Sequence, residues 1–208
     1  SDLQYISIIG SIEGHIALPM ENKTTKYEHL IPQLIAVEEN PKLRGLLVIL
    51  NTMGGDVEAG LALAEMIATL SKPTVSLVLG GGHSIGIPLA TATDYSFIAG
   101  TATMTLHPIR TTGLVITAET TFDYMRKTQD RVIDFIAGHS RATRKRVTEL
   151  MNCSDNMSND VGTILFGKEA VDAGIIDAVG GVSQALGELR RRVAKVDELE
   201  KEISISTD

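Results

Sequence analysis

The sequence predicts an α/β protein of one domain, with a mostly parallel sheet. Short apolar runs alternate with stretches of helical periodicity along the 208 residues. The runs lack the in–out alternation of a half-exposed strand, and apolar residues make up 43% of the chain, enough for a sizeable core. Continuous apolar runs are typical of strands buried on both faces, and the helices between them supply right-handed crossovers.

The first half of the chain is expected to hold four strands separated by three helices. Asp56 is a natural N-cap for the second helix, and Pro73 ends it. Residues 51–55 are expected to turn the chain before that helix, and the polar stretch 21–25 to be irregular. The expected strands are 6–10, 45–50, 74–79 and 95–99, and the expected helices are 30–40, 57–70 and 84–93.

The second half is expected to be more helical. Its longest element is an amphipathic helix, Glu119–Gly138, and its tail, 190–208, mixes both signs of charge and is expected to be a solvated, frayed end. We therefore expect one domain over 1–189 and a charged tail over 190–208. The remaining expected elements are a strand at 104–106, a helix at 142–151, a polar loop at 152–162, a helix at 169–173, a strand at 175–177 and a last helix after 180–181.

Composition excludes several classes of function. The 19 basic and 26 acidic residues leave a net charge of −7, which disfavours a nucleic-acid binder, and the absence of Trp disfavours a base-stacking platform. A single cysteine, Cys153, excludes an intramolecular disulfide and indicates a reducing compartment. No signal-peptide pattern and no apolar stretch of about 18–20 residues is present, so we expect a cytoplasmic protein without a membrane span.

Two glycine clusters, 54–55 and 80–82, lie at predicted strand-to-helix turns. Such turns present backbone N–H groups at a helix N-terminus, which suits a phosphate or an oxyanion. The phosphate motifs fail in detail, because Lys168 is followed by Glu169 instead of Ser or Thr, and Gly82 is followed by Gly86 instead of a glycine at position 85. The simpler alternative is that these glycines only permit tight turns.

The segment from Gly82 to Gly86 fits G-x-S-x-G, with Ser84 on a sharp turn between a buried strand and a helix. This placement exposes a serine Oγ to a substrate and sets it at the positive end of a helix. The alternative is an ordinary serine that caps a helix.

His107 is the candidate base for this serine. It follows the expected strand 104–106 and precedes Pro108, at a strand end where active-site residues of α/β proteins gather. A histidine that only marks a strand end is the alternative. His83 is more simply a residue that lines or packs the turn, and Cys153 an unpaired thiol. No zinc-binding spacing is present, so no metal is expected.

Four segments in order resemble the Clp-type serine peptidases, over about Ile6 to Leu189. The resemblance implies the ClpP/crotonase-type α/β spiral of ββα units, in which the long helix from Glu119 is a protruding handle where two rings face each other. The four segments are N-T-M-G-G-D-V-E-A-G (51–60), G-H-S-I-G (82–86), L-H-P (106–108) and E-A-V-D-A-G-I-I-D (169–177).

The resemblance also implies a site and its partners. Ser84 would be the nucleophile, His107 the general base, and the N–H groups of Gly55 and Ile85 the oxyanion hole. The substrate would be a peptide or an unfolded protein, with no metal or organic cofactor. The protein would form a homo-oligomeric ring, stacked in the family, and a ring ATPase is a possible partner.

Three positions depart from the family pattern. Met53 stands in place of a proline, and His83 in place of a small residue. Gly162 occupies the position of the catalytic acid, and Asp160, two residues away, is the nearest replacement. Without a carboxylate the rate would fall by about 10⁴. Two rival functions stay open: a ring scaffold without peptidase activity, and a crotonase-type acyl-CoA enzyme.

Overall fold

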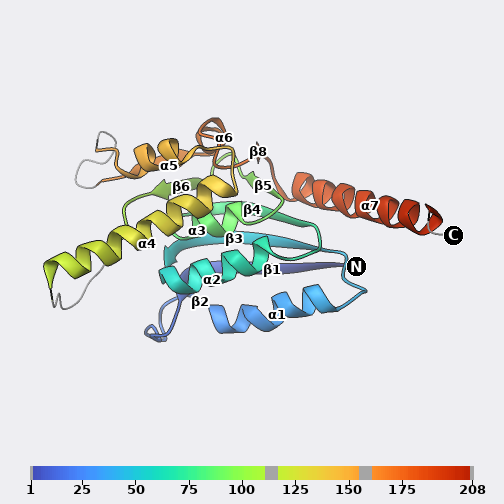
Figure 1. Ribbon diagram of the computed structural model, residues 1–208, viewed down its shortest axis with the longest axis horizontal. Helices are drawn as coiled ribbons and strands as arrows, with labels where there is room; N and C mark the ends of the chain where they lie inside the picture. The colour runs from blue at the N-terminus through green and yellow to red at the C-terminus, as the bar shows by residue number, and fades with distance from the viewer. Residues whose placement is uncertain (1, 111–116, 155–160, 207–208) are drawn as a thin grey trace.

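The computed structural model describes residues 2–110, 117–154 and 161–206 (Figure 1). Its strands and helices alternate through the first half and become mostly helical in the second, as the sequence pattern predicts. In chain order they are β1 (Leu3–Glu13), β2 (Thr24–Lys26), α1 (Tyr27–Glu39), β3 (Gly45–Gly55), α2 (Val57–Ala68), β4 (Thr74–Gly82), α3 (Gly86–Thr91), β5 (Tyr95–Ile98), β6 (Thr103–Leu106), α4 (Ala118–Gly138), α5 (Arg144–Met151), β7 (Thr163–Phe166), α6 (Lys168–Asp172), β8 (Ala178–Val179) and α7 (Val182–Ser206).

The predicted parallel sheet is confirmed. Its main path runs β2-β1-β3-β4-β5-β8, and every pair along it is parallel. Off this path, β6 joins β4 through one parallel residue pair, Gly81 with Thr103, and pairs with β7 in antiparallel fashion. The β6–β7 unit is thus a side branch at the end of β4 where the glycine cluster lies.

Both faces of the sheet are covered. Successive residues of β3 alternate between two apolar clusters, as strand geometry requires: Leu46 belongs to the larger one and Leu47 to the smaller. The larger cluster lies under α1, α2 and α3, and includes Leu34 and Leu63. The smaller lies under α7 and includes Leu189. This burial on two faces explains the continuous apolar runs of β3 and β4.

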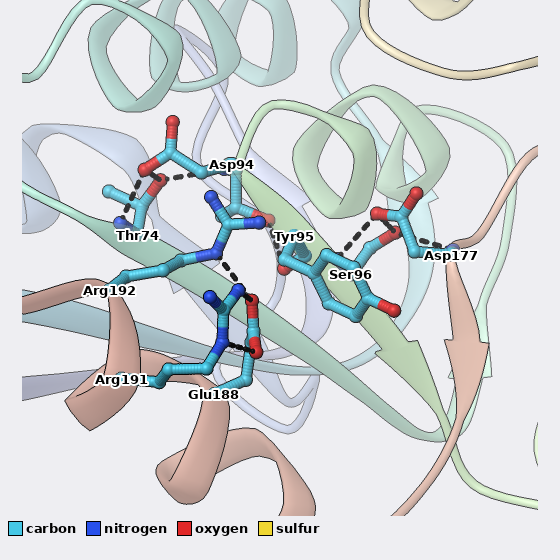
Figure 2. A network of polar contacts seen from close by, with 9 residues as sticks. Thr74, Asp94, Tyr95, Ser96, Asp177, Glu188, Arg191 and Arg192 are labelled. Atoms are coloured by element: carbon cyan, nitrogen blue, oxygen red, sulfur yellow. Dashed lines mark hydrogen bonds and ion pairs between the residues drawn. The ribbon is translucent and has the colours of Figure 1, made fainter. Parts of the chain in front are cut away.

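Helix α7 corrects the expectation of a frayed tail. The helix continues unbroken through Ser206, so the expected boundary between residues 189 and 190 falls inside it, and it extends away from the body of the molecule (Figure 1). The charges of this segment make ion pairs: Glu188 accepts from Arg191 and Arg192, and the Arg192 guanidinium lies 5.3 Å from the centre of the Tyr95 ring (Figure 2). Farther along, Asp197 and Glu200 pair with Arg44 from the start of β3.

Three local expectations were wrong because sheet pairing decided them. Residues 51–55 extend β3 instead of turning, since β1 pairs with them as far as Gly55. The polar stretch expected to be irregular contributes β2, which pairs with the longer β1. A further strand, β7, for which the sequence carried no expectation, pairs with β6. Residues 175–177 are irregular, and the strand expected there lies at 178–179 as β8.

Helix α4 has two unlike halves. Its second half packs on the core through Thr128, Val132 and Ile136, whereas Phe122 and Tyr124 in its first half are 67% and 62% exposed. The first half projects from the body, at the opposite end of the molecule from α7 (Figure 1), in agreement with the expected handle. Among the described helices, none is at once long and apolar enough to cross a lipid bilayer.

Candidate active site

Ser84 occupies a strained turn between β4 and α3. Its φ of +55° is the only positive value among the described residues other than glycine, and such a conformation costs about 1–3 kcal/mol. Three backbone hydrogen bonds hold it: His83 N–H to Thr52 O (3.0 Å), Ser84 N–H to Thr105 O (2.9 Å), and Ile87 N–H to Ser84 O (3.0 Å). The surroundings therefore impose this conformation, as in the nucleophile turns of serine hydrolases.

Gly54 and Gly55 lie directly against this turn. Their φ values are +91° and +152°, in the region that favours glycine. A Cβ on Gly54 would lie 2.7 Å from Ser84 Cβ and 3.4 Å from the Ile85 nitrogen, and one on Gly55 would lie 2.3 Å from Ile12 O. Gly54 and Gly55 therefore lie in the strand β3 and not in a tight turn, and their positive φ and close contacts are what require glycine next to Ser84.

The Ile85 N–H group lies at the head of α3. It has no acceptor among the described residues, and a helix N-terminus favours negative charge. This donor meets the electrostatic requirement for an oxyanion that forms beside Ser84.

His107 follows the last residue of β6, as expected. Its Nδ1 lies 2.7 Å from the carbonyl oxygen of Pro108. Because a carbonyl can only accept, Nδ1 carries a proton, and in the neutral imidazole the lone pair is then on Nε2. This is the tautomer that a general base needs, although in the described part of the chain no hydrogen bond joins His107 to Ser84 Oγ.

One pocket of about 250 Å³ brings the predicted residues together. Ser84, His107, Gly55 and Ile85 all line it, with Met53 at its exposed edge. The rest of its wall is largely apolar, namely Val57, Ile87, Leu106, Ile109, Val132 and Met151, with Arg110 as the charged member. Four of the five predicted site residues are therefore neighbours, and the fifth, Asp160, lies outside the described residues.

Gly162, which the resemblance aligns with a catalytic acid, packs against His107. A Cβ there would lie 2.4 Å from Leu106 O and 3.0 Å from His107 Cβ, and the φ of Gly162 is +142°. A side chain at this position does not fit without a shift of the backbone. Gly162 N–H donates to Cys153 O at 2.7 Å, so Cys153 and Gly162 lie side by side.

A second imidazole, that of His83, lies beside the Ser84 turn but does not line the pocket. Its Nδ1 lies 2.9 Å from Thr105 Oγ1, on the strand that leads to His107. Burial, with a smaller contribution from the charge of His107, lowers the pKa of His83 below its ordinary value. Sequence reasoning missed Thr105 and Pro108 as contacts of the two histidines. Because side chains alternate along a strand, Thr105 and His107 lie on one face of β6, and this pattern could have identified Thr105 as a contact.

The segment 169–177 has a structural role. Asp177 accepts hydrogen bonds from Ser96 N–H and Ser96 Oγ, both at 2.9 Å, and holds the start of β8 against β5 (Figure 2). Glu169 accepts from Phe166 N–H at 3.0 Å. Cys153 lines a different pocket, and within the described ranges no three His, Cys, Asp or Glu side chains gather as metal ligands do.

Comparison with known proteins places these features in a family. The Clp protease family model matches residues 3–183. The chain is 57% identical to the translocation-enhancing protein TepA of Halalkalibacterium halodurans, over 94% of this chain and 76% of that protein. It is 25% identical to an ATP-dependent Clp protease proteolytic subunit of Streptococcus uberis, over 84% of this chain and 83% of that protein. The motifs favour the TepA branch in particular, in agreement with the first of these identities.

Proposed function

The chain belongs to the Clp protease family, and from this we propose that it is a serine endopeptidase subunit that cleaves peptides or unfolded proteins. Ser84 is the proposed nucleophile, His107 the general base, and the N–H groups of Gly55 and Ile85 the oxyanion hole. The observation that carries the proposal is the pocket that these four residues share. Neither a metal ion nor an organic cofactor takes part in the proposed reaction, and hydrolysis by the subunit itself uses no ATP.

The proposed reaction has two halves. Ser84 Oγ attacks the scissile carbonyl carbon while His107 Nε2 takes its proton, and the oxyanion that forms is held by the two N–H groups. His107 then gives the proton to the leaving amine as the C–N bond breaks. In the second half His107 takes a proton from water, whose oxygen displaces Ser84 from the acyl group, and the serine recovers its proton.

The reaction requires His107 Nε2 to come within hydrogen-bond reach of Ser84 Oγ. The tautomer for this step is already in place, since Nδ1–H donates to Pro108 O. Catalytic hydrogen bonds of serine hydrolases are often long without substrate and tighten in the complex. We propose that a bound acyl group brings the pair together in the same pocket.

Asp160 is the proposed third member of the triad. Gly162 contacts His107, and two residues of extended chain span up to about 7 Å, which is enough for the Asp160 carboxylate to reach Nδ1. It would then replace Pro108 O as the partner of Nδ1–H and stabilise the imidazolium. The proposal for Asp160 rests on this distance along the chain.

The proposed assembly is a homo-oligomeric ring, with α4 at the contact between two stacked rings. Support comes from Phe122 and Tyr124, large side chains that stay exposed on the projecting half of α4, since exposed aromatics are enriched at interfaces. A ring ATPase is a further proposed partner. Light scattering on the purified protein should give a mass several times 22.3 kDa, and a monomer at micromolar concentration contradicts the ring.

Two rival functions make different predictions for Ser84. A ring scaffold without peptidase activity keeps the assembly but has an unreactive serine; Gly162 at the position of the acid is the observation that favours it. A crotonase-type acyl-CoA enzyme shares the fold and the oxyanion hole but needs no Ser–His pair. A covalent serine probe separates both from the peptidase.

The decisive experiment treats the assembled protein with a fluorophosphonate and measures intact mass. Wild type should gain one adduct, Ser84→Ala none, and His107→Ala should react at least about 100-fold more slowly because no base takes the proton. Ser7→Ala, which changes an exposed serine of β1, is the matched control and should react like wild type. An assembled wild type that gains no adduct refutes the peptidase and favours the scaffold.

A further inference from the structure

His83 and Thr105 form a contact that the proposed mechanism leaves unexplained. His83 precedes the nucleophile, and its Nδ1 lies 2.9 Å from Thr105 Oγ1. Thr105 lies two residues before His107 on β6. The backbone of the same threonine accepts the N–H of Ser84 at 2.9 Å. One residue of β6 is thus bonded to the nucleophile by its carbonyl and to the nucleophile's neighbour by its side chain.

The strand that carries the proposed base has little backbone pairing with the main sheet. β6 pairs with β4 through a single residue pair, Gly81 with Thr103, whereas its longer pairing, with β7, stays within the side branch. Met104 and Leu106 anchor β6 in the apolar core, and the two bonds to Thr105 tie the strand to the Ser84 turn itself. A shift of β6 would move His107 with it.

The His83 ring packs against the glycine backbone of β4. A Cβ on Gly81 would lie 2.5 Å from His83 Nε2 and 2.8 Å from its Cδ2, so the ring lies directly on the glycine backbone of β4. His83 is half-buried between this backbone and Thr105, and His107 is the titratable group whose charge acts on it. The ring thus contacts β4 on one side and β6 on the other, which is the position of a cross-link between them.

We propose that His83 is a positioning residue, which with Thr105 Oγ1 holds the strand that carries His107 in register with the Ser84 turn. The inference rests on the proposed function, because the geometry matters through the Ser84–His107 pair. A side chain here that merely filled space would need no polar partner on β6.

The test is a double-mutant cycle with His83→Ala and Thr105→Val, read by the rate of fluorophosphonate labelling. Each single change should slow labelling by about 10-fold to 100-fold, since a displacement of about 1 Å has effects of this size. The double variant should be no slower than the slower single one, because both remove one bond. The proposal is overturned if the slowing in the double variant equals the product of the two single effects, or if the single variants label at the wild-type rate.

A conservative variant separates positioning from packing. His83→Asn places an amide where Nδ1 stood and should recover most of the wild-type rate, whereas His83→Gln, which has similar polarity but longer reach, should recover less. In steady-state peptide hydrolysis the loss in His83→Ala should fall on kcat and leave KM unchanged. A His83→Asn variant as slow as His83→Ala, with unchanged circular dichroism, overturns the proposal.

A second readout does not depend on activity. The Cε1–H resonance of His107, assigned with His107→Gln, reports its environment by NMR. It should shift in both His83→Ala and Thr105→Val, and stay in place in His83→Asn. If wild type fails to react with the probe, the proposed function is wrong, but these shifts still decide whether His83 positions the strand; resonances unchanged in all three variants overturn it.

Discussion

Ser84 and His107 line the same pocket but are held in different ways. The nucleophile lies in a turn with three backbone hydrogen bonds and glycines packed against it, whereas the described polar contact of the His107 ring is the carbonyl of the adjacent Pro108. The first half of the site is built by the main sheet, and the second lies on a side branch that pairs with the main sheet through one residue pair. Backbone structure thus preorganises the proposed nucleophile and oxyanion donors, whereas the strand of the proposed base contacts the Ser84 turn partly through the side chains of His83 and Thr105.

The largest expected effect tests whether a carboxylate orients the proposed base, His107. If Asp160 orients His107, Asp160→Asn should keep the assembly and lower peptide turnover by about 10⁴, as in triads that lose the correct tautomer. Asp155→Asn, five positions earlier in the sequence, is the control and should leave the rate within a few-fold of wild type. A wild-type rate in Asp160→Asn would leave a Ser–His dyad whose tautomer is set by Pro108 O.

The next largest effect tests whether the backbone next to Ser84 has to be free of side chains. Gly54→Ala puts a methyl 2.7 Å from Ser84 Cβ and close to the Ile85 nitrogen, so it should displace the serine and obstruct an oxyanion donor. Labelling should slow by about 10²–10³, the cost of losing one such donor. Gly100→Ala, whose methyl meets nothing within 4 Å, is the matched control; equal rates in the two variants would show that the turn tolerates displacement.

A smaller effect concerns the backbone strain at Ser84. Ser84→Gly and Ser84→Ala both remove the hydroxyl, but glycine adopts a φ of +55° without a Cβ penalty. The glycine variant should be the more stable of the two by about 1 kcal/mol, a difference of about 2–4 °C in Tm for a domain of this size. Thermal unfolding measures it, and an alanine variant of equal or greater stability would mean that the turn stores no strain.

The smallest effect is on stability as a function of pH. Burial lowers the pKa of His83 in the folded protein, so below its ordinary value of 6.5 the unfolded chain binds more protons than the folded one. Above pH 6.5 the free energy of unfolding contains the full contribution of neutral His83. As the pH falls toward the lowered pKa of the folded protein, this contribution is lost. Urea unfolding at about pH 7.5 and about pH 5.5 should show a smaller decline in His83→Asn than in wild type. Equal declines would mean that burial of His83 does not oppose its protonation.

Several features of this protein follow from the sequence alone. Apolar runs without alternation identified β3 and β4 as strands buried on both faces, and Asp56 was recognised as a helix cap, which its bond to Ala59 N–H at 2.8 Å confirms. The G-x-S-x-G turn and the histidine at a strand end were predicted separately and lie in one pocket. These signals are local: periodicity, turn chemistry and capping act between residues a few positions apart.

Other features were decided by contacts between distant segments. The charges of 190–206 indicated a frayed end, but Arg44, about 150 positions away, pairs with Asp197 and Glu200 and the helix persists. Residues 51–55 and 163–166 became strands because β1 and β6 pair with them. The contact between His83 and Thr105 and the packing of Gly162 on His107 likewise join segments with no shared local pattern. The sequence determined which residues could act, and the tertiary structure decided which of them meet, because hydrogen-bond and ion-pair energies depend on distances that the order of residues does not specify.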